Sequence, residues 1–170
     1  MAFNLLSILT AEGVEVENTT DEGALHTVTF AANSLQAGKV YEFDGACIVN
    51  DNNGTDTLTL RLRFGASATP TSNTEVVVTA AIDVADADAA VVLAKMHVRS
   101  VGTAGVVVIY GAICQPDAIA VGTTPLFGFA KVVTGVNTTA ALYLQYTADW
   151  SAAHADNEVA AVAAACAEVV

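Results

Sequence analysis

The dominant pattern along the chain is a two-residue alternation of apolar and polar positions. It is clearest in segment 57–64, where Leu58, Leu60, Leu62 and Phe64 alternate with Thr57, Thr59, Arg61 and Arg63. Successive side chains of a β-strand point to opposite faces. The segment therefore predicts a strand with one buried apolar face and both arginines on the other face.

Similar segments recur along the chain and predict about nine strands, with no long helix between them. They cover residues 27–30, 40–43, 57–64, 75–82, 90–100, 105–114, 126–134, 139–150 and 157–170. The last segment is rich in alanine and has helical propensity, but we expect a strand there. Turn-forming residues separate the strands, including those of the break at 115–125.

Many short strands without β-α alternation predict an all-β fold. We expect an antiparallel β-sandwich that is jelly-roll-like, with a closed barrel as the alternative. The segment 50–56 reads Asn-Asp-Asn-Asn-Gly-Thr-Asp, and such residues favour turns. It predicts a hairpin that makes the strands at 40–43 and 57–64 antiparallel neighbours.

Segment 1–22 differs from the rest of the chain. It begins with an apolar stretch that contains Phe3, Leu5, Leu6, Ile8 and Leu9, and acidic residues are concentrated after it. We expect an N-terminal arm at 1–22 and a sandwich domain at 23–170, and the five apolar residues are candidate contacts to a partner. A short strand belonging to the same domain explains the pattern equally well.

Composition and charge narrow the possible partners. The chain has 170 residues, of which 54% are hydrophobic and 14% charged, which fits one domain. Eighteen acids against six bases give a net charge of −12, so we expect no nucleic acid partner. The apolar residues are dispersed among polar ones, so we expect no membrane span, and the N-terminus does not resemble a secretory signal.

Four bases form two pairs on predicted strands, namely Arg61 with Arg63 and Lys95 with Arg99. If both pairs join in one sheet, they form a basic strip suited to an acidic partner, which makes Arg61 and Arg63 further candidate contacts. The alternative is that these are exposed strand charges that discourage aggregation at sheet edges.

The sequence carries no strong catalytic or metal-binding motif. Asp83, Asp86 and Asp88 are close enough in sequence to hold a cation such as calcium, but a solvated loop is the simpler interpretation. The histidines are far apart and no G-x-S-x-G sequence occurs, so we expect neither an enzyme nor a cofactor. Cys47, Cys114 and Cys166 are widely spaced, which favours buried free thiols.

Three stretches carry a resemblance to a known class of protein. They are Asn18-Thr-Thr-Asp-Glu22, Ala32-Asn-Ser-Leu-Gln-Ala-Gly-Lys-Val-Tyr41 and the run from Asn52 to Gly65. The pattern, which lies within segment 1–65, resembles structural proteins of tailed-phage virions. Within that class the chain is most similar to a small jelly-roll decoration or cement protein.

The resemblance implies a location on the capsid surface, after synthesis in the host cytoplasm. It also implies binding to the major capsid protein and assembly with copies of the same chain, with a trimer favoured. No individual functional residue is carried over from it.

Two other functional classes remain open. A tail-fibre or baseplate sandwich that binds a host glycan would use aromatic stacking, for which Tyr143, Tyr146 and Trp150 are candidates. Because Tyr143 and Tyr146 are separated by an odd number of positions, they face opposite ways on one strand, and at most one joins Trp150. A glycan-cleaving enzyme would also need two converging acids, and we rank it last.

Overall fold

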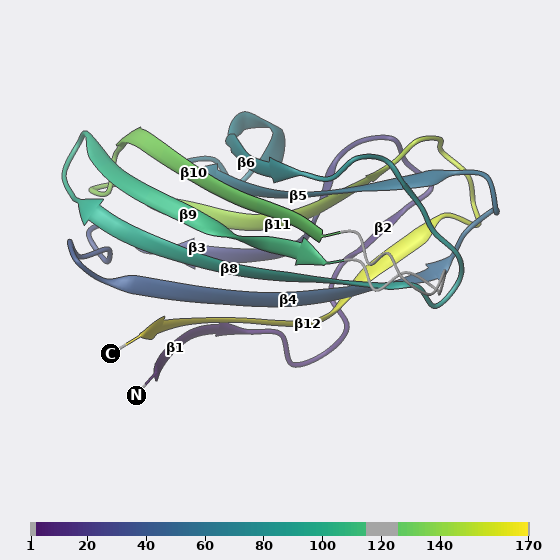
Figure 1. Ribbon diagram of the computed structural model, residues 1–170, viewed down its shortest axis with the longest axis horizontal. Helices are drawn as coiled ribbons and strands as arrows, with labels where there is room; N and C mark the ends of the chain where they lie inside the picture. Colours follow the sequence, from purple (N-terminus) through teal and green to yellow (C-terminus); the bar gives the residue numbers. More distant parts are fainter. Residues whose placement is uncertain (1–2, 115–125, 170) are drawn as a thin grey trace.

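The structure is a computed structural model that describes residues 3–114 and 126–169. These residues form twelve strands and one short 3-10 helix, η1 (Pro70–Ser72), and every strand pairing among them is antiparallel (Figure 1). The predicted all-β class and antiparallel sandwich are confirmed. No helix in these two ranges is long and apolar enough to cross a bilayer. The predicted break at 115–125 lies outside the described residues.

The strands fall into two sheets. Sheet A has the order β1 (Phe3–Ile8), β12 (Glu158–Val169), β4 (Val40–Asp51), β8 (Ala89–Ser100), β9 (Gly105–Cys114) and β10 (Leu126–Val136), and β2 (Glu15–Glu17) also pairs with β12. Sheet B has the order β3 (Gly23–Phe30), β11 (Leu142–Trp150), β5 (Thr57–Gly65) and β6 (Thr74–Val78), and β7 (Ile82–Asp83) also pairs with β5.

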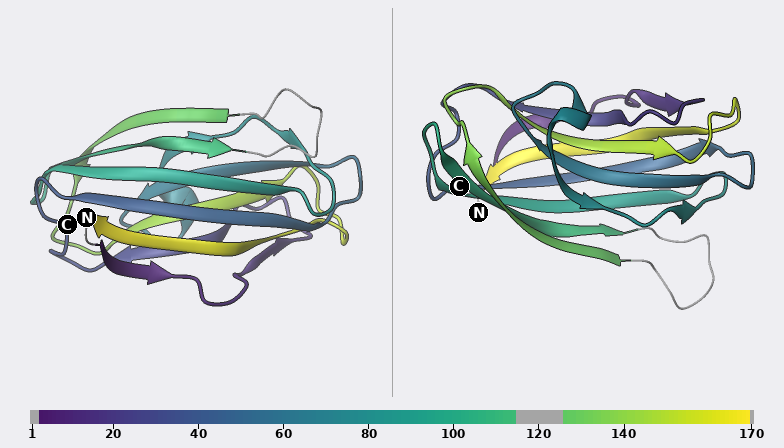
Figure 2. Two further views of the ribbon diagram at one scale, coloured as in Figure 1. Left: turned by 60° about the horizontal axis from the view of Figure 1, so that its bottom comes forward. Right: turned by 90° about the horizontal axis from the view of Figure 1, so that it is seen from above.

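The strand order is that of a jelly roll. Apart from the short β2 and β7 and the added β9 and β10, sheet A reads β1-β12-β4-β8 and sheet B reads β3-β11-β5-β6. The two termini lie side by side because Phe3 pairs with Val169. Figure 2 shows sheet A as a broad, curved layer.

The core fills the space between the two sheets. Leu58, Leu60, Leu62 and Phe64 of β5 all point inward, as the alternation predicts, and each is at most 1% exposed. Phe30 of β3 meets Tyr41 of β4 edge to face, with ring centroids 5.4 Å apart. Alternating strands therefore bury one face of each sheet against the other.

The predicted hairpin at 50–56 is wrong. β4 belongs to sheet A and β5 to sheet B, so the segment between them crosses from one layer to the other. The turn residues act locally as expected, because Asn53 Oδ1 accepts hydrogen bonds from the backbone N–H groups of Thr55 and Asp56. Turn chemistry reverses the chain, but the sheet that each strand joins depends on long-range pairing.

Both ends of the chain are strands of sheet A. The alanine-rich C-terminal segment forms β12, which confirms the strand prediction and lies between β4 and β1. Residues of the expected arm form β1 and β2, which each pair with β12, so they are strands of the same domain, as the second of the two interpretations has it. The predicted strand 75–82 is divided into β6 and β7.

A buried polar network holds the connection between β5 and β6. The Nδ2 group of Asn73 donates to Gln145 Oε1 and to the carbonyl of Ser67, both at 2.7 Å, and its Oδ1 accepts from the Ser67 N–H at 3.0 Å. Gln145 is 0% exposed and donates in turn to the carbonyl of Ala68. The side-chain amides of Asn73 and Gln145 are therefore hydrogen-bonded to each other and to the backbone of the connection.

We expect Asn73→Ala to destabilise the fold by about 2–4 kcal/mol, because the loss of one amide leaves buried groups of Gln145 and the loop backbone unpaired. The matched control Asn137→Ala removes an exposed side chain and should cost about 0.5–1 kcal/mol. Urea unfolding followed by circular dichroism measures both. Equal losses from the two substitutions would contradict the role assigned to Asn73.

Candidate functional site

The outer side of sheet A exposes many of the large apolar side chains of the described strands. The strand pairings align its outward residues in rows that run across the sheet. The rows are Ile8, Ala165, Asp44, Leu93, Ala112 and Gly128; Leu5, Ala167, Glu42, Lys95, Tyr110 and Ala130; and Ala163, Ala46, Val91, Cys114 and Leu126. We call these three rows the sheet A face.

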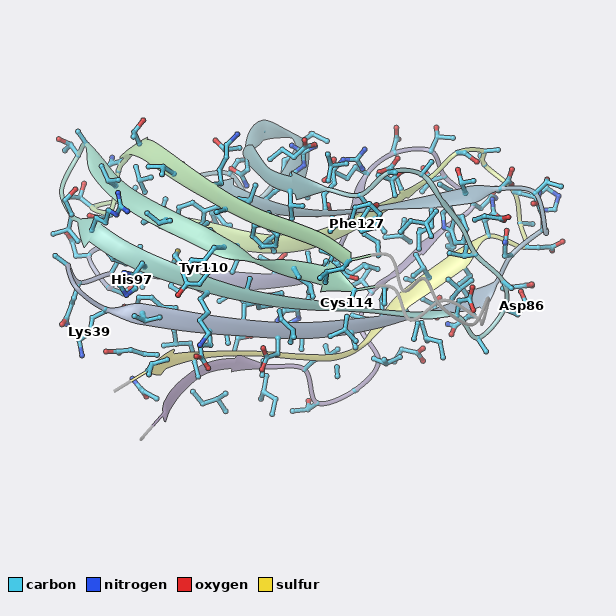
Figure 3. The ribbon with its side chains drawn as sticks, in the orientation of Figure 1. Lys39, Asp86, His97, Tyr110, Cys114 and Phe127 are labelled. Carbon is cyan, nitrogen blue, oxygen red and sulfur yellow. The ribbon has the colours of Figure 1, made fainter. Side chains whose placement is uncertain are left out.

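Several large apolar side chains of this face are open to solvent. The exposed fractions are 56% for Leu5, 55% for Ile8, 48% for Leu93, 40% for Tyr110 and 65% for Leu126. Figure 3 shows Tyr110 on β9 near the middle of the sheet. Clusters of exposed apolar side chains typically mark interaction surfaces.

The face contains two shallow hollows. One, of about 310 Å³, lies between β1, β12, β4 and β8, and Ile8, Ala46, Val91 and Ala163 are among its lining residues. The other, of about 360 Å³, lies over β4, β8 and β9 beside Leu93 and Tyr110. Small residues form much of the floor of the first hollow, so a neighbouring side chain can approach the backbone there.

Charges on the sheet A face are few and partly paired. Lys95 Nζ lies 2.6 Å from Glu42 Oε1 across adjacent strands. Burial and the neighbouring Glu42 raise the pKa of Asp44, and Lys95 opposes this change. The apolar area is therefore interrupted only by a short polar patch near its centre.

The five predicted apolar contacts all lie at the N-terminal edge of the molecule. Leu5 and Ile8 belong to the sheet A face, and Leu6 occupies a bulge of β1 and is 43% exposed. Leu9 instead packs against the core, and its N–H donates to the carbonyl of Ala164 at 2.8 Å. Phe3 pairs through its backbone with Val169, and its side chain lies outside the described part of the structure.

The predicted basic strip does not form. Arg61 and Arg63 lie on sheet B, whereas Lys95 and Arg99 lie on sheet A, so the two pairs are on opposite sides of the sandwich. The edge interpretation also does not apply to β5, because it pairs with β11 on one side and with β6 and β7 on the other.

Acidic side chains surround the two arginines of sheet B. Arg63 makes a two-pronged contact with Glu22, with Nε to Oε1 at 2.5 Å and Nη2 to Oε2 at 2.7 Å. Arg61 pairs with Asp149, and its Nε lies 3.3 Å from Glu75. These arginines are thus already engaged within the chain.

Glu22 is the central acid of this cluster, with a side chain that is 7% exposed. Burial alone would raise its pKa, but hydrogen bonds from Arg63 and from the Thr147 hydroxyl outweigh burial and lower it. The ionised form of Glu22 is therefore favoured in the folded protein.

The aromatic platform proposed for glycan stacking is absent. Tyr146 and Trp150 are 0% and 1% exposed and face the core. The Trp150 Nε1–H donates to the carbonyl of Val16 at 3.0 Å, and the Tyr146 hydroxyl lies 3.2 Å from Cys47 Sγ. Tyr143 is therefore left without the partners that the platform needs.

The three aspartates of the 83–88 loop do not converge on a common point. Asp86 accepts the N–H of Asn52, and Asp88 accepts the N–H of Ala85. Over residues 3–114 and 126–169, three metal-ligand atoms come within 4.8 Å of one another only at Glu15, Glu17 and Glu158. Repulsion from Glu158 is the main cause that raises the pKa of Glu15.

The thiols and the histidines are dispersed. All three cysteines are free, with Cys47 and Cys166 buried, as predicted, and Cys114 partly exposed. Burial raises the pKa of Cys47 to about 11 and that of Cys166 to about 12. His26 stacks on Phe43, with ring centroids 6.1 Å apart, and burial lowers its pKa.

Comparison with known proteins does not identify a family for this chain. No protein-family model and no curated protein sequence matches the chain. Among solved structures, the chain is similar to a xylan beta-1,4-xylosidase from Bacillus halodurans C-125, with a TM-score of 0.38 and 8% sequence identity. The match covers 82% of this chain but only 32% of the xylosidase chain.

Sequence reasoning missed the part of the sheet A face that lies on β8, β9 and β10. The signal was present in the run Leu126-Phe127-Gly128-Phe129-Ala130, where neither alternate set of positions is polar. A strand that is apolar on both faces is either covered on both or offers one face to a partner.

We expect Glu22→Gln to destabilise the protein by about 2–4 kcal/mol at neutral pH, because it leaves Arg63 with a neutral partner in a poorly hydrated site. Because folding lowers the pKa of Glu22, its stabilisation is full above the ordinary value of 4.5 and disappears as the pH falls further. The variant should therefore lose less stability than the wild type on acidification.

Denaturant unfolding across this pH range measures both effects. Glu75→Gln is the matched control, because that side chain is 40% exposed and should matter much less. A parallel acid response of wild type and Glu22→Gln would refute the assignment.

The thiols should differ in reactivity. In the native protein at pH 8 we expect a disulfide reagent to modify Cys114 alone, because Cys47 and Cys166 are buried and their high pKa values leave almost no thiolate. In denaturant all three should react. Rapid modification of two thiols per folded chain would mean that the core is open near Cys47 or Cys166.

Proposed function

We propose that this chain is a non-enzymatic structural protein of a tailed-phage virion that decorates the outer surface of the assembled head and stabilises it. The observation that carries the proposal is the sheet A face, with five large apolar side chains that are each at least 40% exposed. Such a surface fits a protein that works by contact with other protein surfaces. The resemblance carried by segment 1–65 supplies the virion setting.

The charge of the chain supports the same role. A net charge of −12 favours an exterior that repels other particles and keeps them dispersed. A decoration protein also gains from binding in several copies, because linked weak contacts give a high overall affinity. Its partner in this proposal is the major capsid protein.

The edge strand β1 is the contact that we propose for the shell. It pairs with β12 on one side only, and it exposes Leu5, Leu6 and Ile8. Edge strands with apolar side chains add readily to another protein by backbone pairing and side-chain burial. The bulge residue Leu6 has no cross-strand partner of its own, which leaves it free to insert into a neighbour.

Immunogold labelling of phage particles with antibody against the chain tests the location. Regular label over the heads is the expected result. Label at the tail tip would favour the glycan-binding alternative, and particles without label would refute a virion role.

Binding of the purified protein to particles stripped of it tests the contact. We expect Leu6→Glu to weaken binding at least tenfold, because a charge would be buried in an apolar interface. Val14→Glu, at a position that is 72% exposed outside the strands, should bind as the wild type does. Equal binding by the two variants would exclude β1 as the contact.

A further inference from the structure

We infer that the hollow over β4, β8 and β9 is a binding site for a neutral saccharide. In this site Tyr110 stacks on the sugar ring, and charged side chains beside it bond to the sugar hydroxyl groups. The charged side chains that line the hollow are Glu42, Asp44 and Lys95. The inference goes beyond the proposed function, because it concerns a ligand of the chain itself and does not depend on the virion role.

The strand register brings these four side chains together. Glu42 of β4 lies opposite Lys95 of β8, and Lys95 lies opposite Tyr110 of β9, so the three form one row across the sheet. Asp44 is two positions along β4 from Glu42 and therefore points to the same outer face. Strands lie about 4.8 Å apart and positions on one face about 7 Å apart along a strand, so the group covers an area comparable to one or two sugar rings.

The hollow leaves room for a ring beside the tyrosine. Its volume of about 360 Å³ lies within the range of ligand pockets, which is roughly 300–1,000 Å³. Ala112 is the next residue of β9 on this face, and β10 places Gly128 opposite it. A Cβ added at Gly128 would meet no atom within 4 Å, so the hollow is open on the side of β10. Tyr110 itself is 40% exposed, near the middle of the sheet (Figure 3).

The lining groups match the two kinds of surface that a sugar presents. An ionised carboxylate only accepts hydrogen bonds, and a lysine ammonium only donates them. A ligand that bonds to both must carry donors and acceptors close to each other, as the hydroxyl groups of a sugar do. The ring of Tyr110 and the side chain of Leu93 supply apolar surface for the C–H face of the same sugar.

The charges of the hollow favour a ligand without charge. Glu42 and Asp44 against Lys95 leave one net negative charge, in a chain that carries −12, so an acidic saccharide is repelled. A cationic ligand is opposed by Lys95, which stands between Glu42 and Tyr110. A neutral sugar meets neither repulsion.

Asp44 is the group with the most to gain from a ligand. Lys95 Nζ lies 2.6 Å from Glu42 Oε1, whereas Asp44 has no salt-bridge or hydrogen-bond partner among the residues that the structure describes. Partial burial and the neighbouring Glu42 raise the pKa of Asp44. A sugar hydroxyl that donates to this carboxylate replaces part of the hydration that burial has removed.

The hollow and the proposed shell contact are separate parts of the sheet. Tyr110 lies on β9, which is four strands from β1 in the order of sheet A. At a spacing of about 4.8 Å per strand, this is a distance of about 19 Å. The edge strand can therefore bind a shell while the hollow holds a saccharide.

Binding of the purified full-length chain to an oligosaccharide array tests the inference. The array carries neutral oligosaccharides of glucose, galactose, mannose, xylose and N-acetylglucosamine beside sialylated and sulfated ones. An antibody links several copies of the chain, so that weak single contacts add up to measurable binding. We expect the strongest binding to a neutral oligosaccharide. Binding to none of the neutral oligosaccharides, or stronger binding to acidic ones, would overturn the inference.

Substitutions then locate the binding, by titration with the neutral oligosaccharide that binds best. Tyr110→Ala should weaken binding about tenfold through the loss of stacking, and Asp44→Asn about threefold through the loss of a charged acceptor. Tyr143→Ala is the matched control, because it removes a partly exposed tyrosine from sheet B and should bind as the wild type does.

Thermal melting checks that each variant is folded. Asp44→Asn keeps the shape of the side chain, so it decides the result if Tyr110→Ala does not fold. Unchanged binding by the folded site variants, or an equal loss in Tyr143→Ala, would exclude the hollow as the site. A chain that binds a saccharide but labels no particle would leave this inference standing while the proposed function fails, and labelled heads without saccharide binding would give the opposite result.

Discussion

A two-layer sandwich buries only one face of each sheet, and this constraint governs the rest of the molecule. The inward residues of β4, β5, β8 and β11 fill the space between the layers. Every outward residue must meet water or another molecule. Whether an outward face is polar or apolar therefore separates a surface made for solvent from a surface made for a partner.

The outward faces of the two sheets differ in polarity. Sheet B covers its outward side with charges that satisfy one another, since Glu22 holds Arg63 and Asp149 holds Arg61. Sheet A exposes leucine, isoleucine and tyrosine beside small alanines, with few charges between them. The outward side of sheet B is thus dominated by ion pairs, and the outward side of sheet A by exposed apolar side chains.

Candidate residues were harder to predict than strands. The alternation in 57–64 identified the outward arginines correctly, but it could not show that Glu22, from a distant part of the sequence, lies against them. The tyrosine and tryptophan of β11 were sensible stacking candidates by residue type. Their burial depends on the register of β11 between β3 and β5, which no local pattern fixes.

The sequence by itself determined the strands, their inward faces and the all-β class, because a period of two acts over neighbouring residues and needs no distant partner. Tertiary structure alone decided which sheet each strand joins. It turned the 50–56 connection into a crossing between layers, and it placed β1 and β12 side by side from opposite ends of the chain. The sheet A face exists only through these long-range pairings, because its rows join residues from six separate strands.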